Sequence, residues 1–492
     1  MPEPVLALSI TTPQSWAKRH TVKHRRPKRN VLHPNQLKFK IQGSKQQLLQ
    51  MALAKQSPIR KSPTNGLQLD PFQTYPIPTT TCVANMAQYF MQVWGPQHGR
   101  AFAFDGYPNP YLSLLWPFAL QSDLYFEGLI ALCRATSLAS QGRSAREDNA
   151  FAFHRGNVMT KLRARLQNPQ ECADDTTILT VATLGTIDYI LGDHTAATAH
   201  VSGMRQMIKI RGVINPTTPW ERLLQANVAA YESLWSFLFA ADSMSDDTPR
   251  QSGQLVQNAE LPIYMTHPFK PEVCEMLSKL PQGFCDIGLT GVLSLQMIRL
   301  LSELTSLIAR FSVPFMEEHV EMTSRPKMQT TLEDLHRLST LQTTQTERFL
   351  SHGLVAFCYL LRFIHFQDKL TGFYETALKA LTTVALRQTP THRAPDRRCH
   401  LWANMMIATA LQNGQHPPPA WKSVMQQFLD KYYEARQWKK LEKELKTFFW
   451  GEKVSELCKE AYDEAVKRNE KPEATEERPS HHSTMAIRNV IL

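Results

Sequence analysis

Apolar residues recur at intervals of three and four positions from Thr81 onward, and this helical spacing is the strongest constraint on the fold. The clearest stripes lie within residues 178–191, 224–238, 297–311 and 438–448. Strand signals are scarce, because alternating apolar and polar runs joined by Asn-Gly or Asp-Gly turns are almost missing. The sequence therefore predicts an all-α fold, a bundle of many helices.

Turn-forming residues divide the chain. Residues 1–80 combine basic residues with a proline-rich stretch, so we expect a basic arm and linker that is largely disordered. We predict a helical domain over residues 81–466 and a frayed polar tail over 467–492. Within the helical part, breaks in helix are expected near 243–253, 314–345, 389–397 and 413–419.

Positive charge is concentrated at the N-terminus. Residues 1–62 carry thirteen Lys and Arg against the single acid Glu3, whereas the whole 492-residue chain has a net charge of +11. The remainder is therefore close to neutral. The high isoelectric point reflects a cationic arm and not a basic groove on the folded part.

Seven of these cations fall within twelve residues, which is a density typical of nuclear import signals and of segments that contact phosphate. We expect a nuclear import receptor as the partner of this cluster. Weak, sequence-nonspecific nucleic-acid contact and a plain solvated tail are the alternatives. Base-specific reading is not expected, because no helix or ribbon suited to the major groove is encoded there. The cluster consists of Lys18, Arg19, Lys23, Arg25, Arg26, Lys28 and Arg29.

Motifs for cofactors, metals and membranes are not found. The eight cysteines contain no C-x-x-C pair, which favours buried, reduced thiols over a metal site. Glycine-rich phosphate loops, nucleophile elbows and H-E-x-x-H are missing, so we expect no cofactor, no metal and no catalysis. No apolar run reaches 18 residues, so no membrane contact is expected.

The densest group of polar and glycine residues lies between positions 154 and 212. We interpret it as structural: Asp174 opens a helix, Gly192 and Gly212 end helices, and His200 caps or packs between helices. An acid–base pair, formed by Asp188 with His194 or by His154 with a carboxylate, is an alternative that needs tertiary folding. The group consists of His154, Gly156, Asp174, Gly192, His200, Gly203, Arg211 and Gly212.

An aromatic-rich stretch precedes this group. We interpret its rings as helix and loop core, and the alternative is that they line a pocket for a small ligand, in a helical binder or enzyme. The rings are those of Trp94, Phe102, Phe104, Tyr107, Tyr111, Trp116 and Phe118.

The segment from Phe153 to Val213 resembles the fungal-specific transcription factor-like regulatory domain. The order of parts is similar: His154-Arg155-Gly156 opening a helix, Asp174 before an apolar helix, then Gly192, His200, Gly203 and a closing Arg211-Gly212. Two flanking segments are also similar, the short basic segment 10–29 and the aromatic segment 441–460 around Trp450.

The resemblance implies an all-α regulatory body in a fungal nucleus that acts through a transcription-factor or co-regulator partner, without catalysis. The chain departs from the family pattern at two points, of which the first is minor and the second is not. Val213 stands where the family usually has a second glycine, and the six-cysteine zinc cluster that reads DNA in other members is missing. Direct promoter reading is therefore not implied for this chain.

Overall fold

The computed structural model describes residues 74–212, 214–243, 261–311, 318–341, 343–368, 373–414 and 420–469. Two compact units are distinguished, residues 1–66 and 67–492, and every described residue belongs to the second. Residues 1–73 of the predicted arm, with its seven clustered cations, and residues 470–492 of the predicted tail lie outside the described residues.

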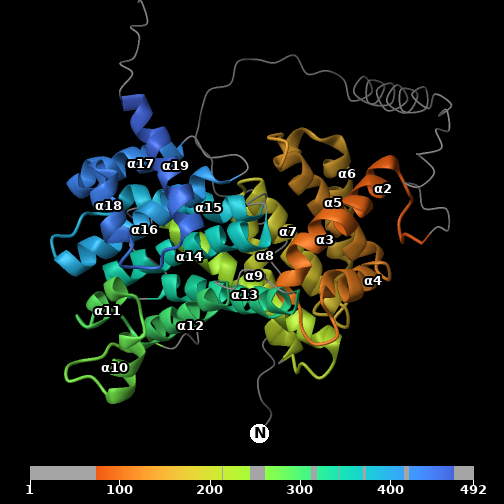
Figure 1. The fold of residues 1–492 in the computed structure, drawn as a ribbon. Helices are drawn as coiled ribbons and strands as arrows, with labels where there is room; N and C mark the ends of the chain where they lie inside the picture. Colours follow the sequence, from red (N-terminus) through yellow and green to blue (C-terminus); the bar gives the residue numbers. More distant parts are fainter. Residues whose placement is uncertain are drawn as a thin grey trace, which may run out of the picture. The chain divides into compact units, whose positions relative to one another are not determined.

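The first half of the described chain forms α-helices with short π- and 3-10-helical turns between them (Figure 1). Its elements are α2 (Thr81–Tyr89), the π-turn η3 (Phe90–Trp94), α3 (Gly95–Gly99), the 3-10 turn η4 (Arg100–Phe102), the π-turn η5 (Tyr111–Leu115), α4 (Trp116–Ala119), α5 (Asp123–Ala139), the 3-10 turn η6 (Ala145–Glu147), α6 (Asn149–Arg165), α7 (Asp175–Ile190), α8 (His194–Arg211) and α9 (Pro219–Ser243).

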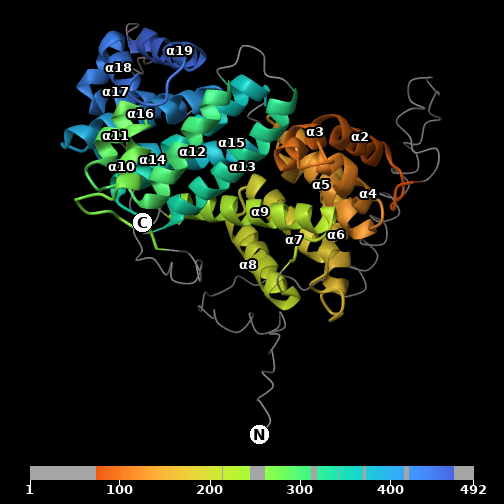
Figure 2. The same cartoon turned by 60° about the horizontal axis from the view of Figure 1, so that its bottom comes forward.

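The second half is also helical (Figure 2). Its elements are α10 (Pro271–Ser278), α11 (Gln282–Gly288), α12 (Leu295–Phe311), α13 (Glu318–Thr340), α14 (Gln345–Phe366), α15 (Phe373–Arg387), α16 (Ala394–Gln412), α17 (Ala420–Lys431), the 3-10 turn η8 (Tyr433–Arg436), α18 (Trp438–Leu445) and α19 (Glu452–Asn469). Within the described residues, β structure is limited to two isolated bridges, Phe104–Tyr107 and Tyr264–Ser294. The all-α prediction is confirmed.

Helix α7 is buried on all its sides between α5 and α8. Its sequence carries four threonines at intervals of three, whose hydroxyls would be unpaired in an apolar core. Thr180, Thr183 and Thr186 donate their hydroxyl protons to the carbonyl oxygens four residues back, at 2.7–3.0 Å. These three hydroxyls are therefore satisfied within the helix, whereas Thr177 donates to the Glu171 carbonyl oxygen at 2.8 Å and Asp188 has its partners on neighbouring helices.

Helices α14 and α16 form the centre of the second half, where they pack against each other. By length and composition α14 is apolar enough to cross a membrane, but 83% of its most apolar window is buried inside the protein. That burial is typical of a core helix. Tight packing at the crossing needs Gly353, because a Cβ there would lie 2.6 Å from the Ala403 Cβ.

One predicted break is wrong. Residues 314–345 were expected to interrupt the helical pattern, but α13 occupies most of them and contains Pro326. The helix forms because Met328, Leu332 and Leu335 make an apolar stripe that is almost fully buried against α9, α12 and α14. Tertiary burial thus outweighs the helix-breaking tendency of proline and the many polar residues.

Candidate functional site

The residues of the family-like segment mark helix boundaries. The Asp174 carboxylate accepts a hydrogen bond from the Thr177 amide at 2.8 Å and caps α7, as expected. Gly192 and Gly212 follow α7 and α8 with φ of +72° and +83°, a region in which a side chain is strained. The helix containing His154 was expected to start there, but α6 begins five residues earlier, because Asp148 caps it.

A buried carboxylate joins three helices of this segment. Asp188 on α7 is inaccessible to solvent, and its Oδ1 accepts a hydrogen bond from Arg155 Nη2 of α6 at 2.6 Å. His200 Nδ1 of α8 lies 2.9 Å from Asp188 Oδ2. His200 therefore packs between helices as predicted. The partners of Asp188 are Arg155 and His200, so the pairing of Asp188 with His194 that was considered is not the one observed.

His154 meets a carboxylate that lies 27 residues away. Its Nδ1 donates to Glu127 Oε1 of α5 at 3.0 Å, and the same carboxylate accepts from Asn157 Nδ2 at 2.8 Å and Lys161 Nζ at 2.9 Å. Burial raises the pKa of Glu127, but the three donors outweigh burial and lower it to about 2. Burial lowers the pKa of His154, but the Cys82 sulfur and Glu127 outweigh burial and raise it to about 9.

These two pKa values describe an ion pair at neutral pH. General acid–base catalysis works best when the pKa of the group lies near the working pH. The pKa of Glu127 lies about five units below neutral pH and that of His154 about two units above it, and the carboxylate already has three donors. The arrangement is that of a structural ion pair that fastens α6 to α5.

The other predicted residues of the segment lie at or near the surface of their helices. Arg211, at the end of α8, forms an ion pair with Asp175 at the start of α7. Around Gly156 and Gly203, a Cβ would meet nothing within 4 Å, so neither position needs glycine for close packing.

Trp450, from the C-terminal aromatic segment, is half-buried beside α18 and α19. It lines an open, mostly charged groove together with Trp438 and Lys446, and its indole N–H has no partner among the described residues.

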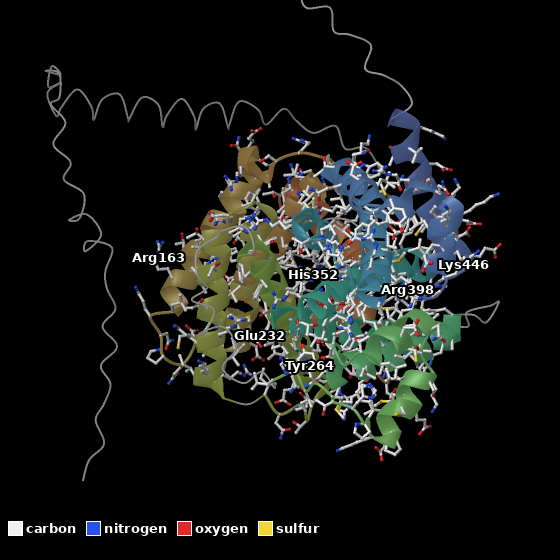
Figure 3. All side chains as sticks on the ribbon, turned by 90° about the vertical axis from the view of Figure 1, so that its left-hand side faces the viewer. Arg163, Glu232, Tyr264, His352, Arg398 and Lys446 are labelled. Carbon is white, nitrogen blue, oxygen red and sulfur yellow. The ribbon has the colours of Figure 1, made fainter. Side chains whose placement is uncertain are left out.

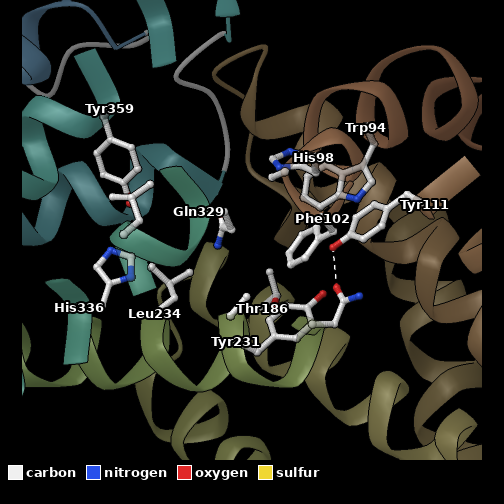
Figure 4. A pocket seen from close by; sticks show the side chains of 14 residues that line it. Trp94, His98, Phe102, Tyr111, Thr186, Tyr231, Leu234, Gln329, His336 and Tyr359 are labelled. Atoms are coloured by element: carbon white, nitrogen blue, oxygen red, sulfur yellow. Dashed lines mark hydrogen bonds between the residues drawn. The ribbon is translucent and has the colours of Figure 1, made fainter. Parts of the chain in front are cut away.

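A pocket lies between the aromatic-rich stretch and α9, α13 and α14 (Figure 4). The enclosed space is about 60 Å³, and the hollow measures about 650 Å³ when its opening to solvent is included. None of the lining residues carries a full charge at neutral pH, and half of them have ring side chains. They are Trp94, His98, Ala101, Phe102, Tyr111, Thr186, Asn227, Ala230, Tyr231, Leu234, Gln329, Leu332, His336 and Tyr359.

Two π-helical turns position one wall of the pocket. Trp94 ends the π-turn η3 and Tyr111 begins the π-turn η5. Such turns insert an extra residue into a helix, which re-aims the side chains, and they are frequent at functional sites. The Trp94 ring lies 4.0 Å from the His98 ring, and Phe102 stacks on Tyr111 at 5.3 Å.

Close packing of α3 on η5 fixes this wall. A Cβ on Gly99 would lie 2.0 Å from Asn109 Oδ1 and 2.6 Å from the Tyr111 Cβ, so only glycine fits. Asn109 Nδ2 donates to the carbonyl of Gly95 at 3.1 Å. The Tyr111 hydroxyl donates to Asn227 Oδ1 of α9 at 2.6 Å, which ties the wall to the floor of the pocket.

Two histidines in the pocket are held uncharged. Burial, reinforced by the positive charge of Arg362, lowers the pKa of His98 to about 3. Burial, reinforced by His352 and Arg337, lowers that of His336 to about 3. His336 is 5% exposed, and neither of its ring nitrogens has a hydrogen-bond partner in the described part of the chain.

A buried charge cluster lies behind Gln329. Asp368, which follows the end of α14, accepts from Arg325 Nη1 of α13 at 2.8 Å and from Arg362 Nε of α14 at 3.0 Å. Arg362 Nη1 also donates to Gln329 Oε1 at 3.2 Å. Gln329 thus separates the uncharged pocket from two buried arginines.

Sequence reasoning found only part of this site. Trp94, Phe102 and Tyr111 do line a pocket, whereas Trp116 and Phe118 pack against the core. His336 was missed, because the segment around it was interpreted as a break.

The cysteines are all within the described residues and none is in a disulfide, and four of the eight are buried. In the same part of the chain, no group of three or more His, Cys, Asp or Glu side chains could hold a metal ion.

Comparison with known proteins identifies the family of the helical part. No curated protein and no solved structure matches the chain significantly. The model of the fungal specific transcription factor domain matches residues 86–437, most of the chain, and includes both the family-like segment and the pocket. The two flanking segments considered similar, 10–29 and 441–460, lie outside the matched residues. The chain belongs to the fungal specific transcription factor domain family.

Proposed function

We propose that this protein regulates transcription in the nucleus, through a helical body that binds a transcription factor or co-regulator. The observation that carries this proposal is the family match over residues 86–437. The chain contains no closely spaced cysteines, since the nearest two, Cys274 and Cys285, are eleven positions apart. A zinc cluster that reads DNA is therefore not formed by these residues, and a partner supplies promoter choice.

The basic arm supplies nuclear import in this proposal. Replacing Lys23, Arg25, Arg26, Lys28 and Arg29 by Ala removes five cations from the densest part of the arm. We expect the fluorescently tagged variant to lose most of its nuclear enrichment. Unchanged localisation would contradict the role of the arm.

A matched control removes charge elsewhere. Lys439, Lys440 and Lys443 are exposed on α18, and their replacement by Ala should leave localisation unchanged. Loss of nuclear enrichment in this control would mean that total charge, and not the arm, directs the protein.

Chromatin occupancy distinguishes partner binding from direct nucleic-acid contact. The chain lacking residues 1–62 is fused to an unrelated import sequence, so that it still reaches the nucleus. Occupancy at discrete promoters should persist if the helical body docks on a partner. Occupancy that is lost would instead favour phosphate contact by the arm, which predicts affinity in vitro that falls steeply with salt and ignores DNA sequence.

A further inference from the structure

The pocket holds an unsatisfied polar side chain that the regulatory role does not explain. His336 is almost fully buried and both ring nitrogens lack partners in the described residues. Leaving such groups unpaired is unfavourable, so native proteins rarely do it without a functional reason or a bound molecule. A neutral imidazole offers one donor and one acceptor. The two nitrogens lie on opposite edges of the ring, so one small molecule in the pocket can pair with one of them, as acceptor or as donor.

The lining determines the charge of that partner. Among the fourteen lining residues there is no Asp, Glu, Lys or Arg. An ion would lose its hydration without gaining a counter-charge, whereas an uncharged molecule would not. In addition to burial, two arginines lower the pKa values of the pocket histidines: Arg362 is already bonded to Gln329 and Asp368, and Arg337 is exposed and paired with Asp334.

Shape and volume determine its size. Trp94, His98, Phe102 and Tyr111 form one wall, and His336 and Tyr359 lie on the opposite side (Figure 4). An engineered apolar cavity of about 150 Å³ in another protein binds benzene. The enclosed 60 Å³ is smaller than this, so a single ring fits only if it extends toward the opening, where Phe102 and Tyr231 are half-buried.

We propose that this pocket binds a small uncharged planar molecule, one aromatic or heteroaromatic ring carrying a hydrogen-bonding group that pairs with one ring nitrogen of His336. The aromatic wall stacks on the ring. Tyr231 and Phe102 cover it at the opening. Binding does not depend on the regulatory role proposed above, and only the use of the ligand as an effector rests on that role.

Three probes that share one benzene ring test the chemistry. Benzamide is neutral and carries a donor and an acceptor, benzoate is its anionic counterpart, and toluene has the ring without hydrogen bonds. Binding to the purified full chain is measured by ligand-observed NMR titration. We expect saturable binding of benzamide with a Kd of about 1 mM or tighter, as suits nine heavy atoms, and at least tenfold weaker binding of the other two.

Substitutions test whether benzamide binds next to His336. His336→Phe keeps a ring of similar size and removes both nitrogens, so it should weaken benzamide binding at least tenfold. His352→Phe is the matched control: His352 is also buried, lies against the same Phe237 ring as His336, and is not among the lining residues (Figure 3). It should bind benzamide as the wild type does.

A second variant keeps the test valid if His336→Phe fails to fold. Ala230 is half-buried at the opening, and Ala230→Phe fills it without removing a buried group. This variant should also lose benzamide binding. Three outcomes would each overturn the proposal. They are wild-type affinity for benzamide in both His336→Phe and Ala230→Phe, equal binding of the three probes, and no detectable binding of benzamide up to 10 mM. None of these outcomes bears on nuclear localisation or promoter occupancy, which test the regulatory role separately.

Discussion

His154 and His336 are buried to nearly the same extent, 3% and 5% exposed, yet their pKa values move in opposite directions. His154 lies against the Glu127 carboxylate, and its pKa rises to about 9. His336 lies among uncharged rings, and its pKa falls to about 3. Burial alone therefore does not decide the charge of a histidine. A charged partner decides whether the buried imidazole is protonated. His336, which has no such partner, is therefore the candidate for binding a ligand.

The largest expected effect comes from removing the partner of His154. Glu127→Ala leaves the buried protonated imidazole of His154 without its carboxylate, whereas Lys161 keeps Asp123 at 2.8 Å, so the substitution should destabilise the protein by about 3–5 kcal/mol. Urea-induced unfolding measures the loss. Glu232→Ala is the control. Glu232 (labelled in Figure 3) is half-buried on α9 and its carboxylate lies 3.5 Å from Arg205 Nε, which predicts a change within about 1 kcal/mol. Equal losses of stability in Glu127→Ala and Glu232→Ala would contradict the interpretation of Glu127 and His154 as a stabilising buried ion pair.

The pH dependence of stability should show the His154 pair directly. The pKa of His154 is about 6.5 in the unfolded chain and about 9 in the folded one. Its stabilisation is fully present below pH 6.5 and is lost as pH rises through 9, a loss of about 3 kcal/mol at 1.36 kcal/mol per unit. Unfolding measured between pH 6.5 and 9.5 should show this decline in the wild type and not in His154→Gln.

The wall of the pocket can be changed without touching His336. Gly99→Ala forces a methyl group against Asn109 and Tyr111, and overpacking of this kind costs about 1–3 kcal/mol. Gly203→Ala in α8 meets open space and should instead stabilise the protein by roughly 0.5–1 kcal/mol. Thermal unfolding of the two variants should therefore shift in opposite directions, and a shift in the same direction would argue against the close contact of α3 with η5.

The smallest expected effect is that of His336 itself. Because its pKa is lowered, its contribution to stability is present above pH 6.5 and is lost as pH falls toward 3. His98 and His352 act in the same direction. His336→Phe should be as stable as the wild type at pH 7, and between pH 6 and 5 its stability should fall less steeply, by up to about 1.36 kcal/mol per unit. A parallel decline in both proteins would mean that His336 is already charged.

Helices and their end residues could be predicted from the sequence, because they depend on neighbouring residues. Contacts between distant helices could not. The stripes of α9 and α12 specify helices because each has one periodic apolar face, whereas α7 is apolar around its whole circumference. Asp174, Gly192 and Gly212 could be placed because caps and left-handed residues depend on their immediate neighbours. Helix α13 was missed because it is held by contacts with distant helices.

The site shows the same limit. Nothing near His154 in the sequence points to Glu127, and the sequence contains no signal that pairs Asp188 with Arg155 and His200. The aromatic residues were noticed because they are dense, but density alone does not separate a packed core from a pocket. The difference lies in the two π-turns and in the position of α13, which are properties of the folded chain.

The Asp368 cluster determines which side of the pocket is free to adjust. One carboxylate clamps an arginine from each of α13 and α14, so sliding one helix past the other would strand two cations away from water. The facing wall has neutral hydrogen bonds from Asn109 and Tyr111, and its ion pair with α13, Arg100–Glu321 at 3.5 Å, is exposed to solvent. A ligand that needs more room would therefore displace the segment around residues 94–111, while α13 and α14 would keep their positions relative to each other.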